Sequence, residues 1–392
     1  MPDDRAQSWR NRPPGRHIGL LSTYPPKLCG LATFTAALEA GLMRAGDRVT
    51  VVAVDDGEDG RAAPPRTQHQ LVNGSPASVG ETARVLSRAD VAIVQHEYGI
   101  YGGADGDEVI DVLSSLTVPA IVILHTVLTD PTAHQRSVLE TVCDLAARVV
   151  VMTEAAGARL TAGYSIDASK VVTIPHGASL PVARHEPARG GDGGRPQLLT
   201  WGLLGPGKGI EHVIRAMSML DDVRPRLRYT VAGATHPKVF ARDGDRYRQS
   251  LIREARAMGV ASSVKFDDSY RDVPALTRFV SSASLVVLPY DSRDQVTSGV
   301  LVDAIAAGRP VIATAFPHAV ELLSDGAGIV VPQRDPVALA AAIRETTSDP
   351  AVLDAMAARA REIAPSLSWG AVAAEYRALC DALSPLVTAA SS

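Results

Sequence analysis

The chain has 392 residues, of which 46% are hydrophobic and 21% charged, and its formal net charge is −4 with a pI near 6.2. This length exceeds what a single hydrophobic core normally serves, so two domains of similar size are expected. The slight acidity excludes a general basic surface for nucleic acid or anionic membrane, and lysines and arginines must act locally.

The cysteines and the N-terminal segment bear on compartment. Cys29, Cys143 and Cys380 lie far apart without metal-ligand spacing, and their odd number fits a reduced, cytoplasmic protein. Residues 1–15 are polar and lack an apolar signal core, and no stretch approaches 18 unbroken apolar residues. We therefore interpret 1–15 as a flexible tail without stable membrane insertion. Peripheral contact of its arginines with a membrane surface is the alternative.

From residue 16 onward, short Val, Ile and Leu runs alternate with longer amphipathic stretches, which is typical of a doubly wound parallel α/β sheet. The runs predict strands at 17–21, 49–54, 91–95, 120–124, 148–152 and 171–174. The amphipathic stretches predict helices at 32–44, 81–87, 107–116, 133–146 and 154–162. Together they predict a Rossmann-like domain over residues 16–185.

A segment rich in glycine and proline follows and predicts an interdomain linker at 186–196. The alternation then resumes, with strands predicted at 197–201, 227–232, 264–266, 285–289, 311–313 and 328–331. Helices are predicted at 210–219, 247–257 and 298–307. This series predicts a second Rossmann-like domain over 197–365. Residues 366–392 are predicted to form a last helix and a tail, with Trp369, Val372 and Tyr376 on one helical face.

Glycine-containing loops follow the first strand of each half. Gly30 lies in the first loop, and Gly205, Gly207 and Lys208 lie in the second. Glycine at a strand-to-helix turn lets backbone approach a phosphate, and a helix N-terminus favours an anion. Neither loop has the G-x-G-x-x-G pattern, which argues against nicotinamide or flavin binding.

Polar side chains also follow buried strands in the first half. His96, Glu97 and Tyr98 follow one strand, and His125 follows the next. The carboxyl edge of an open parallel sheet is where ligands bind, so two histidines at neighbouring strand ends favour a functional role. A structural role is the alternative for either alone. His176 precedes the passage into the second half, and we interpret it as mainly structural.

The stretch 285–322 gathers its polar residues in one loop between an apolar strand and a small-residue helix. Ser298 and Gly299 stand just before this helix, where their N–H groups could meet a distal phosphate. Acidic residues at strand ends form no D-x-D-like cluster in the sequence. We therefore expect no catalytic metal.

The order of these motifs resembles the family 4 retaining glycosyltransferases, over about residues 17–379. The resemblance implies the GT-B fold, in which two Rossmann-like domains face a cleft and a C-terminal helix crosses back to the first. In that family a loop acid and a helix acid eight residues later hold the sugar and the ribose of a nucleotide sugar. Gln295 and Asp303 occupy these positions here. The family's usual arginine after the first glycine of the second loop is Leu203, so Lys208 must carry more charge, or Arg293 could help.

The resemblance also implies roles for other residues. His125 would contact the donor sugar and its phosphate and act with Lys208 in catalysis, whereas His96, Glu97 and Tyr98 would lie on the acceptor side. The residues expected to bind the donor are Gly30, Gly205, Gly207, Lys208, Arg293, Gln295, Ser298, Gly299, Asp303 and Glu321. For Glu321, a helix-capping role is the alternative.

The resemblance thus implies a retaining hexosyltransferase (EC 2.4.1.-), which we expect to be metal-independent and to need no cofactor. It would move a hexose from a nucleotide diphosphate sugar, of the GDP-mannose or UDP-glucose type, to a hydroxyl of a sugar or glycoconjugate. Nucleic acid is not an expected partner. The alternatives are a catalytically silent nucleotide-sugar-binding protein and another GT-B enzyme, such as a sugar-nucleotide epimerase.

Overall fold

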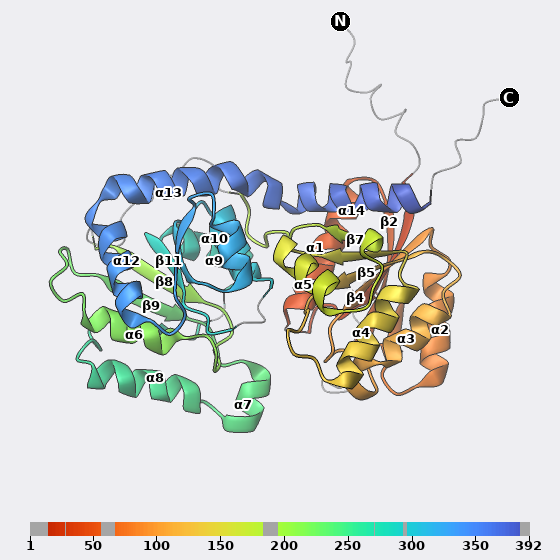
Figure 1. The fold of residues 1–392 in the computed structure, drawn as a ribbon, viewed down its shortest axis with the longest axis horizontal. Coiled ribbons are helices and arrows are strands. Elements are labelled where there is room, and N and C mark those ends of the chain that lie inside the picture. The colour runs from red at the N-terminus through yellow and green to blue at the C-terminus, as the bar shows by residue number, and fades with distance from the viewer. Residues whose placement is uncertain are drawn as a thin grey trace, which may run out of the picture. The chain divides into compact units, whose positions relative to one another are not determined.

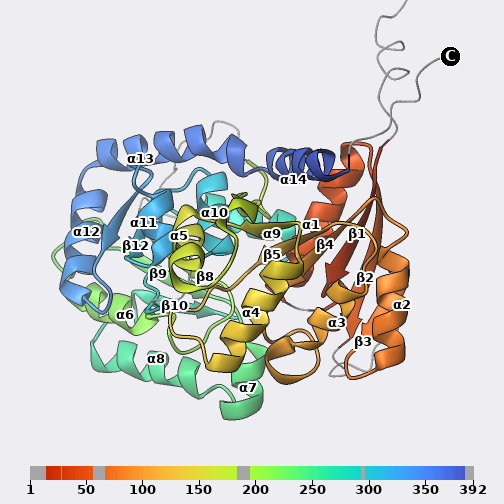
Figure 2. The same cartoon turned by 45° about the vertical axis from the view of Figure 1, so that its right-hand side comes forward.

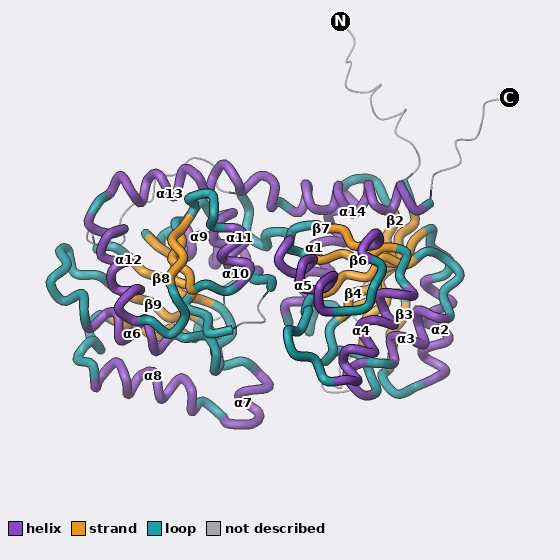
Figure 3. The backbone as a smooth tube through the Cα atoms, in the orientation of Figure 1, coloured by secondary structure: helices purple, strands orange, loops and turns teal. Residues whose placement is uncertain are grey.

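The structure is a computed structural model that describes residues 15–27, 29–55, 67–182, 195–269, 271–292 and 296–384. It divides into two compact units. Unit 1 comprises Met1–Gly177 and Trp369–Ser392, and unit 2 comprises Ala178–Ser368. In each unit the strands form a central sheet with helices on both sides (Figure 3). The division at Gly177 precedes the predicted linker, most of which lies outside the described residues.

Unit 1 contains a seven-stranded parallel sheet in the order β3-β2-β1-β4-β5-β6-β7. Strands β1 to β5 of this sheet are labelled in Figure 2. Its strands are β1 (His17–Ser22), β2 (Arg48–Asp55), β3 (His69–Val72), β4 (Val91–His96), β5 (Ala120–Leu124), β6 (Arg148–Val151) and β7 (Val171–Thr173). The six strands predicted in this half are confirmed, whereas β3 was not predicted. The winding reverses between β1 and β4, and in such sheets the carboxyl edge at this point is the usual ligand site.

The helices of unit 1 are α1 (Gly30–Arg44), α2 (Pro76–Leu86), α3 (Glu108–Ser114), α4 (Ala133–Leu145), α5 (Glu154–Gly163) and α14 (Trp369–Leu383). The predicted helices are confirmed, although α2 begins five residues earlier than predicted. The reason is a start signal at that point: Pro76 opens the first turn, and the Ser75 side chain accepts a hydrogen bond from the Ser78 N–H.

Helices α1 and α14 lie side by side over one face of the unit 1 sheet (Figure 1). Apolar residues at alternate positions of β1 and β4 pack against them, because successive strand residues point to opposite faces. Trp369, Val372 and Tyr376 of α14 are buried in the same core. The predicted apolar face of the last helix is therefore part of the hydrophobic core of unit 1.

Unit 2 contains a six-stranded parallel sheet in the order β10-β9-β8-β11-β12-β13. The strands are β8 (Gln197–Trp201), β9 (Arg228–Ala232), β10 (Val264–Asp267), β11 (Leu285–Leu288), β12 (Val311–Thr314) and β13 (Gly328–Val331). All six were predicted. Here the winding reverses between β8 and β11, which places the second glycine loop and the stretch after β11 at the corresponding edge.

The helices of unit 2 are α6 (Ile210–Ser218), α7 (Pro237–Asp243), α8 (Arg246–Ala257), α9 (Val273–Ser281), α10 (Gly299–Ala306), α11 (Pro317–Leu322), α12 (Pro336–Ser348) and α13 (Pro350–Ile363). One face of the sheet packs against α6, α8 and α12, and the other packs against α9, α10, α11 and α13. Both faces of the sheet are therefore buried, which explains why its strands are nearly continuous apolar runs.

The two points where the chain passes between the units lie next to each other within each unit. In unit 2, the Ala178 N–H donates to the Leu367 carbonyl at 2.7 Å. In unit 1, a Cβ added to Gly177 would lie 2.4 Å from the Trp369 ring. In the described ranges, no helix combines the length and apolar character needed to span a bilayer.

Candidate functional site

The carboxyl edge of the unit 1 sheet carries the histidines predicted from the sequence. His96 is the last residue of β4, and the His125 N–H just beyond β5 donates to the His96 carbonyl at 3.1 Å. The two strands thus remain paired up to the point where the polar residues begin. The His125 ring contacts Phe34 of α1 edge-on, with ring centroids 5.1 Å apart. The sheet therefore brings these two histidines together as predicted.

His96 is fully buried, and neither of its ring nitrogens has a hydrogen-bond partner in the part of the chain that the structure describes. Its ring lies edge-on to Tyr98 at 5.1 Å. Burial lowers the pKa of His96 to about 4. The other two residues predicted on the acceptor side are engaged: Glu97 accepts from the Thr126 hydroxyl at 2.6 Å, and the Tyr98 hydroxyl bonds Tyr164.

His125 and His176 are also neutral at physiological pH. Burial, followed by the charges of His176 and His96, lowers the pKa of His125 to about 3. Burial lowers the pKa of His176 to about 4. His176 and Trp369 both stack edge-on against Phe34, so the three rings and His125 form one aromatic cluster. This agrees with a mainly structural role for His176.

Gly30 is the first residue of α1, in the loop that follows β1. It is exposed, and an added Cβ would meet nothing within 4 Å. The Cys29 side chain caps the helix by accepting from the Ala32 N–H at 3.4 Å. Open space at Gly30, beside the unpaired N–H groups of a first helical turn, is compatible with the predicted anion contact.

In unit 2 the second glycine loop leads from β8 into α6. Gly209 has a φ of 62°, and a Cβ there would lie 1.9 Å from the Pro289 carbonyl oxygen, so only glycine fits. Gly205 is buried, whereas Gly207 is exposed with a φ of 85°. Leu203, in place of the family's arginine, is 39% exposed. The close approach at Gly209 ties the loop to the end of β11.

Lys208 points across this edge to an aromatic ring that was not predicted from the sequence. Its Nζ lies 4.3 Å from the centroid of Tyr290, a residue that is 1% exposed. Burial lowers the pKa of Lys208. The ring face offers the ammonium a favourable electrostatic contact where it has lost water. The only sequence signal for Tyr290 is its position directly after a buried strand.

The Tyr290 hydroxyl bonds the side chain of Ser298, the N-cap of α10. Ser298 also accepts from the Leu301 N–H at 3.3 Å, and its own N–H donates to Nδ1 of His318 at 2.8 Å. The Ser298 N–H is thus already used inside the protein, which corrects the prediction that it meets a phosphate. Gly299 begins α10, where first-turn N–H groups lack an intrahelical partner.

Asp303 lies on α10 and is 8% exposed. Its Oδ1 accepts from the Ser179 N–H at 2.6 Å and the Leu180 N–H at 3.0 Å. Burial raises the pKa of this carboxyl to about 7, although the two hydrogen bonds oppose the shift. One oxygen of the residue predicted to hold the ribose therefore holds the backbone at the start of unit 2.

The remaining predicted donor residues are placed only in part. Glu321 is half-buried within α11 rather than at its N-cap, which is Phe316. Glu321 is therefore not the N-cap of α11. Arg293 and Gln295 lie outside the described residues.

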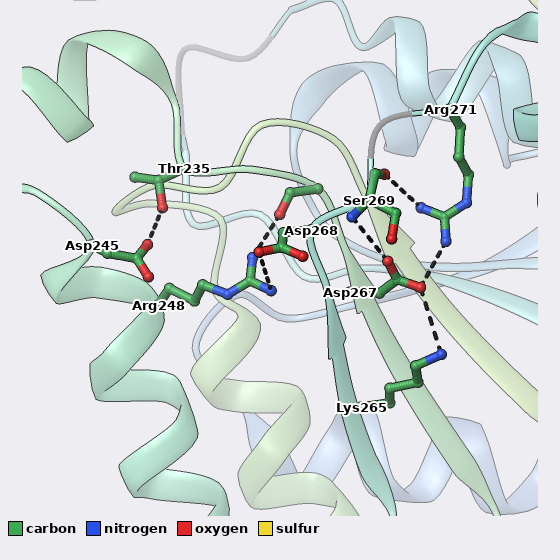
Figure 4. A network of polar contacts seen from close by, with 9 residues as sticks. Thr235, Asp245, Arg248, Lys265, Asp267, Asp268, Ser269 and Arg271 are labelled. Carbon is green, nitrogen blue, oxygen red and sulfur yellow. Dashed lines mark hydrogen bonds and ion pairs between the residues drawn. The ribbon is translucent and has the colours of Figure 1, made fainter.

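A polar network at the carboxyl end of β10 was not predicted. Figure 4 shows Arg271 and Lys265 directed at the Asp267 carboxylate, at 2.7 Å and 3.6 Å. Burial opposes ionisation of Asp267, but hydrogen bonds from Ser269 and Arg271 outweigh it and lower its pKa. Arg248 donates to the Gly233 carbonyl at 2.9 Å. Unit 2 thus carries several charges at the same edge as Lys208.

Comparisons with known proteins assign each half of the chain. The description Glycosyltransferase Family 4 matches residues 29–180, and Glycosyl transferases group 1 matches residues 183–363. The D-inositol 3-phosphate glycosyltransferase of Kineococcus radiotolerans is 30% identical over 263 residues, 59% of this chain and 56% of the relative. The enzyme of the same name from Streptomyces avermitilis is 28% identical over 240 residues, 58% of this chain and 50% of the relative. The chain spans about half the length of these curated relatives.

Solved structures show the same fold at lower sequence identity. Sucrose-phosphate synthase from Thermosynechococcus elongatus has a TM-score of 0.72 and 21% sequence identity, and the match covers 94% of this chain and 100% of the synthase chain. Anabaena Alr3699/HepE in complex with UDP-glucose has a TM-score of 0.69 and 17% identity, covering 93% of this chain and 100% of that chain. With two doubly wound units and a matching description on each half, the chain belongs to the family 4-type glycosyltransferases of the GT-B fold.

Proposed function

We propose that the protein transfers a hexose from a nucleotide diphosphate sugar to a hydroxyl of a sugar or glycoconjugate, with retention at the anomeric carbon. The observation that carries this proposal is the Lys208 ammonium, held over Tyr290 at 4.3 Å at the reversal point of the unit 2 sheet. A single partly desolvated cation beside a glycine loop suits a diphosphate leaving group, because electrostatic stabilisation strengthens away from water.

The proposed reaction requires stabilisation of negative charge rather than a nucleophile supplied by the protein. The bond between the anomeric carbon and the diphosphate oxygen breaks, and a bond to the acceptor oxygen forms on the same face. The acceptor proton passes to the leaving diphosphate. Lys208 and the N–H groups at the start of α10 would stabilise the negative charge that grows on the diphosphate.

In this proposal unit 2 binds the donor, while the histidines of unit 1 contact the hexose and the acceptor. Support for a nucleotide sugar comes from the name of the Anabaena complex, which contains UDP-glucose. Support for GDP-mannose comes from a GDP-mannose:glycolipid 4-beta-D-mannosyltransferase of Xanthomonas campestris, 34% identical over 117 residues, 30% of each chain. Metal independence and a cytoplasmic location are parts of the proposal. The three cysteines are free, which suits a reducing compartment.

A catalytically silent nucleotide-sugar-binding protein is the second candidate. Two observations favour it: Leu203 offers no charge to a phosphate, and one oxygen of Asp303 is occupied by backbone N–H groups. Both reduce the number of groups that could grip a donor, and neither removes Lys208.

The test is turnover of a panel of UDP-, GDP- and ADP-hexoses with sugar and polyol-phosphate acceptors, with and without a chelator. Product formation that survives the chelator, with retained anomeric configuration by NMR, is expected for one donor class. Calorimetric binding of a nucleotide sugar without product from any acceptor would favour the silent protein. Product with inverted configuration would overturn the retaining mechanism.

A further inference from the structure

A chain of hydrogen bonds in unit 1 connects three elements behind His125. The Thr35 Oγ1 of α1 lies 2.9 Å from the Thr23 carbonyl oxygen and 2.8 Å from the Leu31 carbonyl oxygen. The Gln95 Nε2 of β4 lies 2.7 Å from Thr35 Oγ1, and Gln95 Oε1 lies 2.8 Å from Nε2 of His125. Thr35 and Gln95 are buried, so water does not compete for these contacts.

The direction of each hydrogen bond follows from the two carbonyls. A backbone carbonyl only accepts, so the Thr35 hydroxyl must donate its proton to one of them. Its oxygen can then only accept from Gln95, which requires the amide nitrogen of Gln95 to face Thr35. The amide oxygen consequently faces His125. Because an amide oxygen cannot donate, His125 must carry its proton on Nε2.

The other ring nitrogen of His125, Nδ1, is then unprotonated and keeps its lone pair. In the part of the chain that the structure describes, Nδ1 of His125 has no hydrogen-bond partner. The edge-on contact with Phe34 restrains the plane of the ring. A neutral imidazole in this tautomer can accept a hydrogen bond at Nδ1 and cannot donate one there.

We propose that Gln95 and Thr35 are positioning residues that hold His125 as the Nε2–H tautomer, so that Nδ1 accepts a hydrogen bond from a hydroxyl group of the transferred sugar. A phosphate oxygen, which has no proton to give, is not a partner for this nitrogen. The phosphate contact implied for His125 by the family resemblance is therefore replaced by a hydroxyl contact. The identity of the ligand rests on the proposed function, whereas the tautomer does not.

The tautomer is measured by NMR on full-length protein labelled with 15N-histidine, with the His125 signals assigned by their loss in His125→Asn. The parent should show a protonated Nε2 and an unprotonated Nδ1. Gln95→Leu and Thr35→Val should give a mixture of tautomers, because nothing then orients the amide or the imidazole. Gln95→Glu should retain the Nε2–H form, since a carboxylate oxygen still accepts from it.

Tyr101→Phe is the matched control, because the Tyr101 hydroxyl donates to the backbone carbonyl of Gln95 at 2.6 Å and not to its side chain. It should leave the tautomer unchanged. An Nδ1–H tautomer in the parent, or a single unchanged tautomer in both Gln95→Leu and Thr35→Val, would overturn the proposal.

Steady-state kinetics provide a second test, independent of the tautomer measurement. If a hexose donor is turned over, Gln95→Leu should lower kcat/KM at least about tenfold, and Gln95→Glu should restore part of that loss. A hexose donor that lacks the contacted hydroxyl should be insensitive to Gln95→Leu. If every deoxy-hexose donor loses as much as the parent hexose, the hydroxyl contact is wrong. The predicted tautomer without turnover of any nucleotide sugar would instead count against the proposed function alone.

Discussion

The carboxyl edges of the two sheets have similar architecture and opposite chemistry. In unit 1 the edge holds His96, His125 and His176, whose pKa values burial lowers well below neutral pH. In unit 2 the corresponding edge holds Lys208 and the charged network around Asp267. The histidine edge and the Lys208 loop begin from the same pattern, a largely buried parallel strand followed by polar residues.

The difference indicates a division of labour. The buried, neutral histidines of unit 1 discriminate by the direction of hydrogen bonds, because a misplaced donor or acceptor there costs about 1 to 3 kcal/mol. A charged edge stabilises an anion with less dependence on direction. Unit 1 is thus suited to hydroxyl groups and unit 2 to a diphosphate, and each of the following changes tests one side of this comparison.

The largest effect is expected for Lys208→Ala, which removes the charge at the unit 2 edge. Turnover should fall at least about 10²-fold, since one preorganised charge on a developing anion is worth about 3 kcal/mol. Tyr229→Phe is a control in the same unit, as its buried hydroxyl bonds Thr200 at 2.9 Å. Activity of Lys208→Ala within a few-fold of the parent would show that the division of charge is wrong.

Gly177→Ala should disturb the unit 1 edge alone. The added Cβ would lie 2.4 Å from the Trp369 ring, which packs on the Phe34 ring that contacts His125. Overpacking of this kind costs about 1 to 3 kcal/mol of unfolding free energy, measurable by urea denaturation. Gly163→Ala is the control, because its Cβ would meet nothing within 4 Å. Equal stability of the two variants would contradict the tight packing.

Gln295→Glu should change which hexose donors the protein prefers. An amide both donates and accepts, whereas glutamate only accepts, so the preferred hydroxyl pattern should change. We expect shifts of about 1 to 3 kcal/mol in kcat/KM among hexose donors, with nearly unchanged affinity for the free nucleotide diphosphate. An identical donor ranking together with weaker nucleotide binding would mean that residue 295 serves the nucleotide end.

Asp303→Asn should remove a pH dependence opposite in sign to that of the buried histidines of unit 1, whose lowered pKa values make stability fall as pH drops. The folded pKa of about 7 lies above the ordinary value of 3.8 for an aspartate, so the native state favours the protonated carboxyl. Its contribution to stability is present at low pH and is lost as pH rises toward 7, by at most roughly 1.4 kcal/mol per pH unit. Denaturation midpoints of parent and Asp303→Asn should therefore diverge between these pH values and run parallel above them. Parallel behaviour throughout would contradict the raised pKa.

The sequence predicts the sheets well because their strands are buried on both faces and appear as apolar runs. It misses β3, whose only buried residue is Leu71. It also misses α9, α12 and α13, which begin with proline in the first turn after the capping residues Asp272, Asp335 and Asp349. Proline at that position starts a helix, and the pattern is easily mistaken for a break.

The site is predictable only as far as single residues reveal it. His125 and Lys208 follow strands and stand out by residue type. Their partners Gln95 and Tyr290 do not. Gln95 contacts His125 from 30 positions earlier in the sequence, and Tyr290 contacts Lys208 from a different loop. The use of Asp303 by the backbone of Ser179 depends on a fold in which residues 124 positions apart meet.

The neighbouring passages at Gly177 and Trp369 make unit 2 an insertion within unit 1 rather than the second of two consecutive domains. A stop codon near residue 365 would therefore leave the unit 2 sheet complete and strip α14 from the core of unit 1. Unit 1, although most of it is encoded first, would be the unit that such a truncation damages. Exchange of unit 2 between related genes instead requires two cuts, one on each side of Ala178–Ser368, with the final helix left in place.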